Sequence, residues 1–400
     1  MNILYINNEG FDTPNSNNHL NMTMIDDFLK NGLNVHLIAS HRKGIYPDIP
    51  KILENRNGFT YDIIKRSVVI KTHLIRRYLN EAMYAFKAMK KWRKEPSEID
   101  VVYIQNNPAS VFHVFLLSAF LRKPIVLTVF DIFPGHAYDV GAIKSKLLMH
   151  IFEIIQKCVY RKVKSIVVVS EDMKHSLLRI GVREEKVCVI NLWFDTQIYR
   201  EIQKSENVIL RDFQIPTHMF IVQFAGLLSF VLDYKIIIDV AKILQHEKSI
   251  IFMVVGDGNF KDDLLEEVKE KRLANIKYFP WQPLERIVDL YNACDIGFIP
   301  LKKGVIKGSY PSKACQLWAC KKPIICTVED SNFTSTVNNK RLGISISDFN
   351  PQSVANAILY MFNNRKALNE MGENGYAYTH DNYKREVNTQ MYVELLRKSI

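Results

Sequence analysis

The sequence predicts an α/β protein built from two doubly wound, Rossmann-like domains. The chain has 400 residues, more than one hydrophobic core usually holds. Short runs rich in Val and Ile alternate with patterns of helical period, and this alternation restarts after the polar stretch 195–216. A content of 48% hydrophobic and 24% charged residues is typical of a globular protein and excludes a disordered one.

The first half contains apolar runs typical of buried strands in a parallel sheet. They are Asn2–Ile6, Asn34–Ala39, Val101–Gln105, Ile125–Val129 and Ser165–Val169. We expect helices between them over 21–31, 73–94, 109–121, 144–161 and 171–180. Repeated βα units imply a parallel sheet that helices cover on both faces.

The second half repeats the same alternation with its own set of strands. They are predicted at Ile221–Ala225, Ile250–Val255, Ile276–Phe279, Ile296–Ile299, Pro323–Cys326 and Gly343–Ile346. We expect the helices at 234–245, 260–271, 284–294, 312–319 and 351–363, and a last one over 381–397. These patterns predict an N-terminal domain over 1–200, a hinge over 201–215 and a C-terminal domain over 216–379. Ligands of such folds bind at the carboxyl ends of the strands.

The net charge of +11 comes mostly from the first half of the chain, and much of the excess lies in one stretch. Residues 51–95 contain 12 Lys and Arg but only 4 Asp and Glu. This patch indicates an acidic partner, which by itself could be nucleic acid, a membrane surface or a phosphorylated substrate. The six cysteines form no CxxC pair, so we expect a reducing compartment and no metal site. The start of the chain lacks a signal-peptide pattern, and the longest apolar stretch, 111–121, is too short to span a membrane.

Several short motifs follow one another along the chain. They are NGLNV at 31–35, NP at 107–108, TVFDIFP at 128–134 with Gly141, VVVS at 167–170 with INLWFD at 190–195, VVGDG at 254–258, YNACDI at 291–296 with Pro300, and PSK at 311–313 with KPI at 322–324. In this order they resemble the motifs of the GT-B glycosyltransferases of family 4, especially the branch that builds bacterial capsule and O-antigen. The resemblance runs over nearly the whole chain.

The resemblance implies a retaining enzyme that moves a sugar from a nucleotide donor, expected to be UDP-linked, to a lipid-linked saccharide. It also implies that the C-terminal helix, within 380–400, crosses back to the N-terminal domain. No DxD triplet occurs in the chain, so we expect neither a metal ion nor another cofactor. A polyprenyl-diphosphate-linked saccharide at the inner face of the cell membrane would be the acceptor.

Candidate donor-binding residues follow from the second-half motifs. Lys313 supplies a charge that could stabilise the departing diphosphate, and Gly226 would let the backbone approach the phosphates. The further candidates are Gly256, Trp281, Pro311, Ser312 and Gln316. Much of the family has two glutamates where this chain has Gly308 and Gln316, so both carboxylates are missing.

Candidate acceptor residues lie in the first half. Asp131 follows a buried strand, and we assign it a catalytic role in orienting acceptor or donor hydroxyls; Lys313, at the diphosphate, is the second catalytic candidate. The other candidates are Glu9, Gly10, Asn18 and His19 in the first βα loop, and His136. Each of these could instead be a turn or capping residue.

The basic stretch predicts an amphipathic helix over 73–94. Its apolar stripe, which we expect to face inward, holds Ile75, Tyr78, Leu79, Ala82, Phe86 and Met89. The membrane-facing candidates are Arg76, Arg77, Lys87, Lys90 and Lys91. A cationic face of this kind can lie on anionic lipid, although a charged face that is merely solvated is equally compatible with the pattern. No nucleic-acid-binding module is recognisable.

Two alternatives to a transferase stay open at this point. The missing glutamates also fit a catalytically inactive GT-B subunit that binds a membrane or a partner enzyme. A UDP-sugar epimerase of the same fold is the other alternative, although such enzymes need more acidic residues at the ligand site than the motifs supply.

Overall fold

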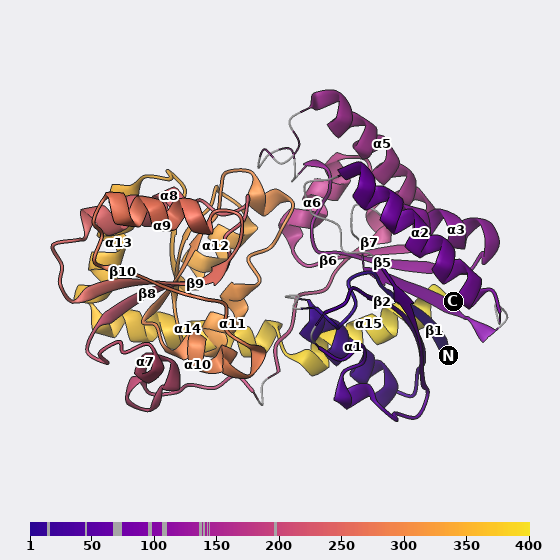
Figure 1. Cartoon of the computed structure of the whole chain (residues 1–400), viewed down its shortest axis with the longest axis horizontal. Coiled ribbons are helices and arrows are strands. Elements are labelled where there is room, and N and C mark those ends of the chain that lie inside the picture. Colours follow the sequence, from indigo (N-terminus) through magenta and orange to yellow (C-terminus); the bar gives the residue numbers. More distant parts are fainter. Residues whose placement is uncertain are drawn as a thin grey trace. The chain divides into compact units, whose positions relative to one another are not determined.

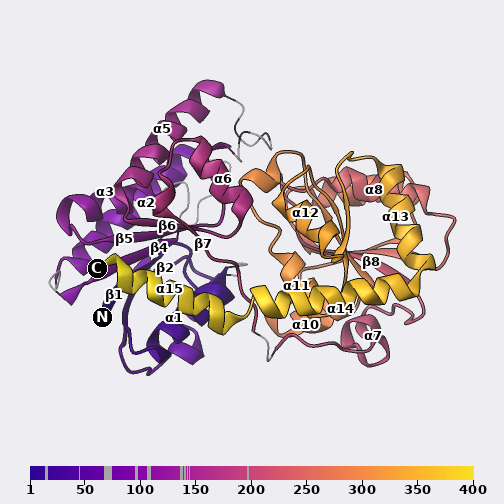
Figure 2. The same ribbon diagram turned by 180° about the vertical axis from the view of Figure 1, so that it is seen from behind.

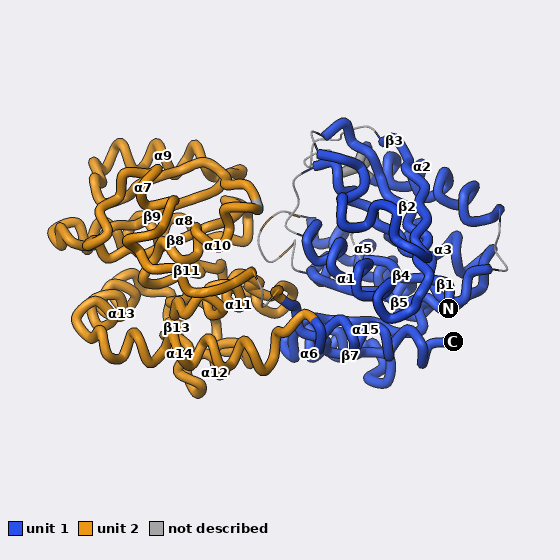
Figure 3. The backbone as a smooth tube through the Cα atoms, turned by 90° about the horizontal axis from the view of Figure 1, so that it is seen from below, with its two compact units in different colours: residues 1–135, 145–193, 386–400 blue, residues 136–144, 194–385 orange. Residues whose placement is uncertain are grey.

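The structure of the chain is a computed structural model. It describes residues 1–13, 17–44, 46–66, 74–94, 98–105, 110–135, 138, 141, 143, 145–195 and 198–400, without the side chains of Leu74, Ile75, Arg77 and Leu284. The chain forms two compact units, shown in Figure 3. Unit 1 comprises 1–135, 145–193 and 386–400, and unit 2 comprises 136–144 and 194–385.

Unit 1 is built on a seven-stranded parallel sheet of order β3-β2-β1-β4-β5-β6-β7. Its strands are β1 Asn2–Asn7, β2 Asn34–His41, β3 Phe59–Lys65, β4 Val101–Gln105, β5 Ile125–Val129, β6 Ser165–Val168 and β7 Val187–Val189. The five predicted strands are confirmed. β1, β4 and β5 are almost fully buried, as their near-continuous apolar sequences require in a sheet covered on both faces.

Helices cover both faces of this sheet. α2 Leu74–Trp92, α3 Val111–Phe120 and α5 Lys146–Lys162 lie on one face, and α1 Asn18–Lys30 and α15 Arg385–Ser399 lie on the other (Figures 1 and 2). α6 Glu171–Arg179 connects β6 to β7, and its N-cap Ser170 accepts a hydrogen bond from the Met173 N–H, as predicted.

The C-terminal helix α15 belongs to unit 1, which confirms the predicted crossing back. The Tyr392 ring meets the Tyr103 ring of β4 edge-to-face at 6.1 Å, and the Thr389 hydroxyl donates to Asp27 of α1 at 2.9 Å. The last 15 residues therefore complete the core of the N-terminal half of the chain.

Unit 2 is built on a six-stranded parallel sheet of order β10-β9-β8-β11-β12-β13. Its strands are β8 Phe220–Leu227, β9 Ile250–Asp257, β10 Ile276–Phe279, β11 Ile296–Pro300, β12 Ile324–Thr327 and β13 Gly343–Ile346. All six correspond to predicted strands. Its α-helices are α7 Val208–Asp212, α8 Tyr234–Ile243, α9 Lys261–Glu270, α10 Ile287–Asn292, α11 Lys313–Ala319, α12 Asn332–Asn339, α13 Pro351–Asn363 and α14 Arg365–Asn382. Unit 1 and unit 2 thus each have the predicted doubly wound α/β architecture.

The expected hinge segment, 201–215, makes contacts within unit 2. The Asn207 side chain donates to the Asp289 carbonyl at 2.8 Å and also caps α7. The Phe213 ring stacks on the Phe279 ring with 3.7 Å between centroids. These contacts tie the segment to α10 and to the end of β10.

Candidate active-site regions in the two units

Two strand-end glycines lie side by side at the carboxyl edge of the unit 2 sheet. Gly226 of β8 pairs in register with Gly256 of β9. A Cβ atom on Gly256 would collide with the Gly226 carbonyl, so only glycine fits there without a shift of the backbone. β8 also adjoins β11, where the strand order reverses, and such a switch point is where open α/β sheets bind ligands.

Lys313, at the start of α11, reaches this glycine pair. A Cβ atom built on Gly226 would lie 2.5 Å from Lys313 Nζ, so the ammonium occupies the space that a side chain would fill. Burial lowers the pKa of Lys313. Among the described residues the ammonium has no hydrogen-bond or ion-pair partner. The structure therefore brings together the predicted Lys313, Gly226 and Gly256 around an unpaired cation, an arrangement that suits a bound anion.

Gln316 lies one turn further along α11, and its side-chain amide is hydrogen-bonded to two tyrosines. Its Oε1 accepts from the Tyr291 hydroxyl at 2.8 Å, and its Nε2 donates to the Tyr199 hydroxyl at 3.0 Å. Both tyrosines are buried. Because both ends of the amide are already bonded, Gln316 positions α11 against its neighbours in this state.

The remaining donor candidates directly precede α11 or follow β10. Pro311 is buried, whereas the Ser312 side chain is exposed and makes no capping hydrogen bond. Trp281 follows β10 and is 48% exposed, so its indole is available for stacking.

Glu329 is an acidic residue at this edge that motif reading missed. It follows β12, whose last residue, Thr327, is in register with Pro300 of β11. Glu329 Oε1 accepts the Gly304 N–H at 2.8 Å, in the loop that continues to Gly308. Glu329 Oε2 and the Thr327 hydroxyl are buried and have no partner among the described residues. The order of the strands in the sheet would have indicated Glu329. Because β11 and β12 are neighbours, the residues that follow β12 lie beside the loop that follows β11.

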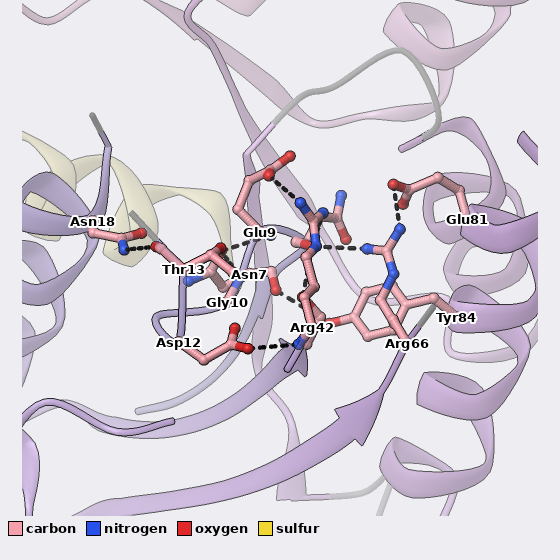
Figure 4. A network of polar contacts seen from close by, with 12 residues as sticks. Asn7, Glu9, Gly10, Asp12, Thr13, Asn18, Arg42, Arg66, Glu81 and Tyr84 are labelled. Atoms are coloured by element: carbon pink, nitrogen blue, oxygen red, sulfur yellow. Dashed lines mark hydrogen bonds and ion pairs between the residues drawn. The ribbon is translucent and has the colours of Figure 1, made fainter. Parts of the chain in front are cut away.

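In unit 1, the first βα loop forms a polar network with β2 and β3 (Figure 4). The Asn7 carboxamide oxygen accepts the N–H groups of Glu9 and Gly10. Arg42 at the end of β2 forms an ion pair with Glu9 at 2.7 Å and also donates to the Asn8 carbonyl. Gly10 has φ +72°, and a Cβ atom there would collide with the Ser40 carbonyl. The predicted Glu9 and Gly10 thus form one ordered loop.

A buried ion pair lies beside this loop. Arg66 donates to Glu81 at 2.5 Å and to the Asn8 carbonyl at 2.8 Å, and both ion-pair side chains are only 3% exposed. The Arg66 guanidinium also lies 4.8 Å from the centre of the Tyr84 ring (Figure 4). Arg66, Glu81 and Arg42 were not predicted, since their partners lie far away in sequence.

Several polar atoms of the network are buried without a protein partner. Among the described residues they are Arg66 Nε, Glu81 Oε2, Asn7 Nδ2 and both polar atoms of the Asn8 side chain. Burying a polar group without a hydrogen bond is costly, so such a cluster is typical of a ligand site. The charges of Arg42 and Arg66 are balanced by Glu9 and Glu81. The cluster therefore offers donors and acceptors without net charge, which suits hydroxyl groups.

Of the other acceptor candidates, the structure describes Asp131, Asn18 and His19. Asp131 is exposed and follows β5, so its carboxylate is accessible to a substrate. Asn18 begins α1, and its amide donates to the Thr13 carbonyl at 2.9 Å, which is a structural role. His19 is half-buried in the first turn of α1. His136 lies outside the described residues, as does the motif at 107–108.

The structure corrects the prediction for the amphipathic helix α2. Leu79 and Phe86 were expected to face inward but are 60% and 52% exposed. Of the membrane-facing candidates, Arg76, Lys87 and Lys90 are exposed, whereas Lys91 is half-buried and forms an ion pair with Asp62 at 2.7 Å. The Arg77 side chain lies outside the described part of the chain.

A potential metal-ligand cluster occurs near the unit 1 loop. Asp12, His41 and Asp48 could each direct one ligand atom to a common point. However, one Asp12 oxygen already accepts the backbone N–H groups of Arg42 and Gly44, and His41 Nδ1 lies 2.6 Å from Asp48. These hydrogen bonds explain the cluster without a metal ion, because they hold the loop after β2 against the first βα loop.

Comparisons with known proteins agree with the fold. The family "Glycosyltransferase Family 4" matches residues 21–198, and "Glycosyl transferases group 1" matches residues 206–378. WbjE of Pseudomonas aeruginosa, named as a glycosyltransferase, is 26% identical over 298 residues, 72% of each chain. WcaI of Escherichia coli K12, named as a glycosyl transferase of colanic acid biosynthesis, is 23% identical over 42% of this chain and 41% of its own.

A solved structure extends the similarity to the whole chain. HepE of Anabaena, crystallised with UDP and glucose, is 17% identical and superimposes with a TM-score of 0.76 over 100% of both chains. At this identity the likeness concerns the fold. Two doubly wound parallel sheets, a returning C-terminal helix and the family matches define a glycosyltransferase of the GT-B fold. The chain belongs to glycosyltransferase family 4.

Proposed function

We propose that this glycosyltransferase transfers a sugar, with retention, from a UDP-linked donor to a lipid-linked saccharide during surface polysaccharide assembly. The observation that carries the donor assignment is the unpaired Lys313 ammonium against Gly226 and Gly256. HepE, which shares the fold, binds UDP and glucose, and WcaI is named for colanic acid biosynthesis. The ligands of HepE support a UDP-sugar donor, and the name of WcaI supports a role in polysaccharide assembly.

Lys313 is proposed to hold the diphosphate of the donor. Breaking the sugar–phosphate bond leaves negative charge on the diphosphate, and a fixed cation in a partly dehydrated site stabilises that charge as it develops. Glycine at 226 leaves the ammonium its place against the strand end, and glycine at 256 lets β9 lie directly beside the Gly226 carbonyl. Trp281 is proposed to contact the uracil, and Ser312 a phosphate oxygen. We expect no metal ion or cofactor in this step.

Glu329 is proposed to replace the carboxylate that is missing at Gly308. Its Oε1 is fixed by the Gly304 N–H, so the carboxylate is anchored to the same loop that carries Gly308. Its other oxygen is unpartnered within the described structure and could accept from a donor-sugar hydroxyl. The absence of a glutamate in the motif is then compatible with activity.

In unit 1, the neutral polar cluster around Asn8 is proposed to receive the acceptor saccharide. Glu9, Gly10 and Asn18 shape its loop, and His19 and His136 remain candidates for acceptor contacts. Asp131 is proposed as the carboxylate that orients the attacking hydroxyl. In a retaining transfer the donor phosphate itself takes the acceptor proton, so the protein needs to position this hydroxyl but not to deprotonate it.

Release of UDP by the purified protein tests this proposal. UDP formation from UDP-glucose, UDP-galactose and UDP-N-acetylglucosamine would be followed for the wild type and Lys313→Ala. We expect steady UDP release from at least one donor and a loss of about 100-fold or more in the variant. Lys242→Ala, which removes an exposed lysine of α8, is the control. Release of free UDP in no assay would favour an inactive subunit, and conversion of the UDP-sugar to an isomer without UDP release would favour an epimerase.

The affinities for UDP and for the UDP-sugar, measured separately, test the role proposed for Glu329. Glu329→Gln should bind UDP as the wild type does but lose about tenfold in affinity for the UDP-sugar that the wild type prefers, because a hydroxyl contact to a carboxylate is lost. Asp330→Asn, at the exposed neighbouring position, is the control. Equal losses for UDP and UDP-sugar would instead indicate that Glu329 only holds the Gly304 loop.

A further inference from the structure

Two helices on one face of unit 1 expose stripes of large apolar side chains. On α2 the stripe consists of Leu79, Met83 and Phe86, which are 52% to 60% exposed. On α5 it consists of Leu147, Ile151 and Ile154, which are 44% to 72% exposed. Both stripes have the spacing i, i+4, i+7, which places their members on one side of a helix. We call these six residues the apolar face.

The helices that carry the apolar face are packed together with α3. The Tyr78 ring of α2 stacks on the Phe152 ring of α5 at 5.3 Å. Arg93, just after α2, lies over the exposed Phe120 ring of α3, and Lys162 of α5 lies over the exposed Phe115 ring. Figure 1 shows the three helices side by side on the same face of the sheet. The apolar stripes, the two phenylalanines and these cations thus belong to one helical layer.

This layer carries a strong positive charge. Within α2, α3 and α5 the acidic residues are Glu81 and Glu153. Glu81 is buried against Arg66, and Glu153 forms an ion pair with Lys157 at 2.9 Å. The same helices contain five Lys or Arg in α2 and four in α5. Lys157 is thus paired, and Lys91 is paired with Asp62 of β3. The cations of this layer without an ion-pair partner among the described residues are Arg76, Lys87, Lys90, Lys146, Arg161 and Lys162.

We propose that the apolar face inserts into the interfacial region of an anionic bilayer, with the surrounding Lys and Arg contacting lipid headgroups. The charge argues for this occupant over a second copy of the chain, because two copies meeting through this layer would place cations against cations. None of the described helices is long and apolar enough to cross a membrane. Apolar side chains and lysines on a helix surface are the combination that binds in the plane of the interface.

This proposal rests on the proposed function, because a lipid-linked acceptor is the reason why the protein would need a membrane. In parallel βα units the helix that follows a strand begins at the carboxyl edge of the sheet. The first turns of α2 and α5, which hold Arg76 and Leu147, therefore lie at the same sheet edge as the Glu9 loop and Asp131. A bilayer on this layer would present a diphosphate-linked lipid near the acceptor loop. The earlier expectation involved cations alone, whereas the structure adds the apolar side chains that insert.

Vesicle flotation of the full-length protein tests the proposal. The probes are vesicles of phosphatidylcholine with and without phosphatidylglycerol. We expect binding to the anionic vesicles only, and a loss of about tenfold or more in Leu79→Ser/Met83→Ser/Phe86→Ser, because three inserting side chains are removed. Leu147→Ser/Ile151→Ser should show a smaller loss. Val387→Ser/Met391→Ser on α15 of the same unit, where the side chains are 52% and 42% exposed, should bind as the wild type does.

Charge-reversal variants, the salt dependence of binding and the oligomeric state provide further tests of the proposal. Lys87→Glu/Lys90→Glu should also weaken binding, and the wild type should retain more binding at high salt than the apolar triple variant, because salt screens the charge contacts only. Unchanged binding of the apolar variants would overturn the proposal, as would a wild-type dimer in ultracentrifugation that these variants dissociate. Circular dichroism and UDP titration of each variant separate a failure of this inference from misfolding and from a failure of the proposed function.

Discussion

The Lys313 ammonium occupies the space beside Gly226 that a side chain would take, since a Cβ atom there would lie 2.5 Å from Nζ. This relationship joins a strand end and a helix start that are 87 positions apart in the sequence. It also makes the cation and the glycine dependent on each other. A side chain at position 226 would displace the ammonium to which an anion would bind.

Gly226→Ala should therefore weaken UDP binding, by about tenfold or more, because the added methyl group displaces the ammonium and strains a backbone with φ +157°. Isothermal calorimetry measures this. Gly181→Ala is the matched control, since Gly181 has φ +88° but open space around its Cβ position. Equal UDP affinity in wild type and Gly226→Ala would show that Lys313 does not hold the nucleotide.

The lowered pKa of Lys313 predicts a pH dependence of UDP affinity. Burial disfavours the charged form, so the ammonium of the free protein loses its proton below the ordinary value of 10.5. Affinity should fall as the pH rises through this lowered pKa. Lys313→Arg keeps its charge at these pH values and serves as the reference, because the titration of UDP itself is common to both proteins. Parallel pH profiles of the two proteins would contradict the assignment.

The same shift fixes the sign of the effect on stability. Between the lowered folded-state pKa and 10.5 the unfolded chain binds more protons at Lys313 than the folded chain does. The contribution of this group to the free energy of unfolding therefore rises with pH across that window. Bound UDP should reverse the effect, because it favours the charged form.

The buried Arg66–Glu81 pair predicts a large stability change. Glu81→Ala should lower the free energy of unfolding by about 3–5 kcal/mol, because the guanidinium is left buried without its partner. Urea unfolding measures this. Glu185→Ala is the control, since its ion pair with Arg183 is exposed and should contribute less than about 1 kcal/mol. A loss in Glu81→Ala no larger than in the control would mean that water reaches Arg66.

His113 predicts acid sensitivity of unit 1. Burial, with a smaller effect of nearby Arg66, lowers its pKa to about 3. Because an unfolded histidine takes up a proton near pH 6.5, this group lowers the free energy of unfolding as the pH falls from 6.5 toward 3, by about 1.4 kcal/mol per unit. His113→Gln should show a shallower slope between pH 6.5 and 5, and His246→Gln, at an exposed position, should match the wild type. A variant as acid-sensitive as the wild type would contradict this.

The fold was predictable because buried parallel strands appear in the sequence as short apolar runs. Two of the exceptions have clear physical reasons. β3 is a half-exposed edge strand whose Thr60 and Tyr61 face solvent, so its pattern is weak. α14 contains Gly372 and Gly375, which hide its helical pattern but allow close packing, since Cβ atoms there would collide with Lys321 and Trp318.

The candidate sites were only partly predictable from the sequence. Local motifs led to Lys313 and Gly226, because the family places them at a strand end and a helix start. Glu329 and the Arg66–Glu81 pair were missed because burial and an unmade hydrogen bond are properties of the folded chain. Gln316 shows the converse case, in which a motif position is already bonded to two tyrosines.

Calorimetric titration of the purified full-length protein with UDP tests the central claim most directly. The account predicts saturable binding of one UDP per chain, weakened at least tenfold in Lys313→Ala and unchanged in Lys242→Ala. Absence of binding at millimolar UDP, or equal affinity in the wild type and Lys313→Ala, would contradict it.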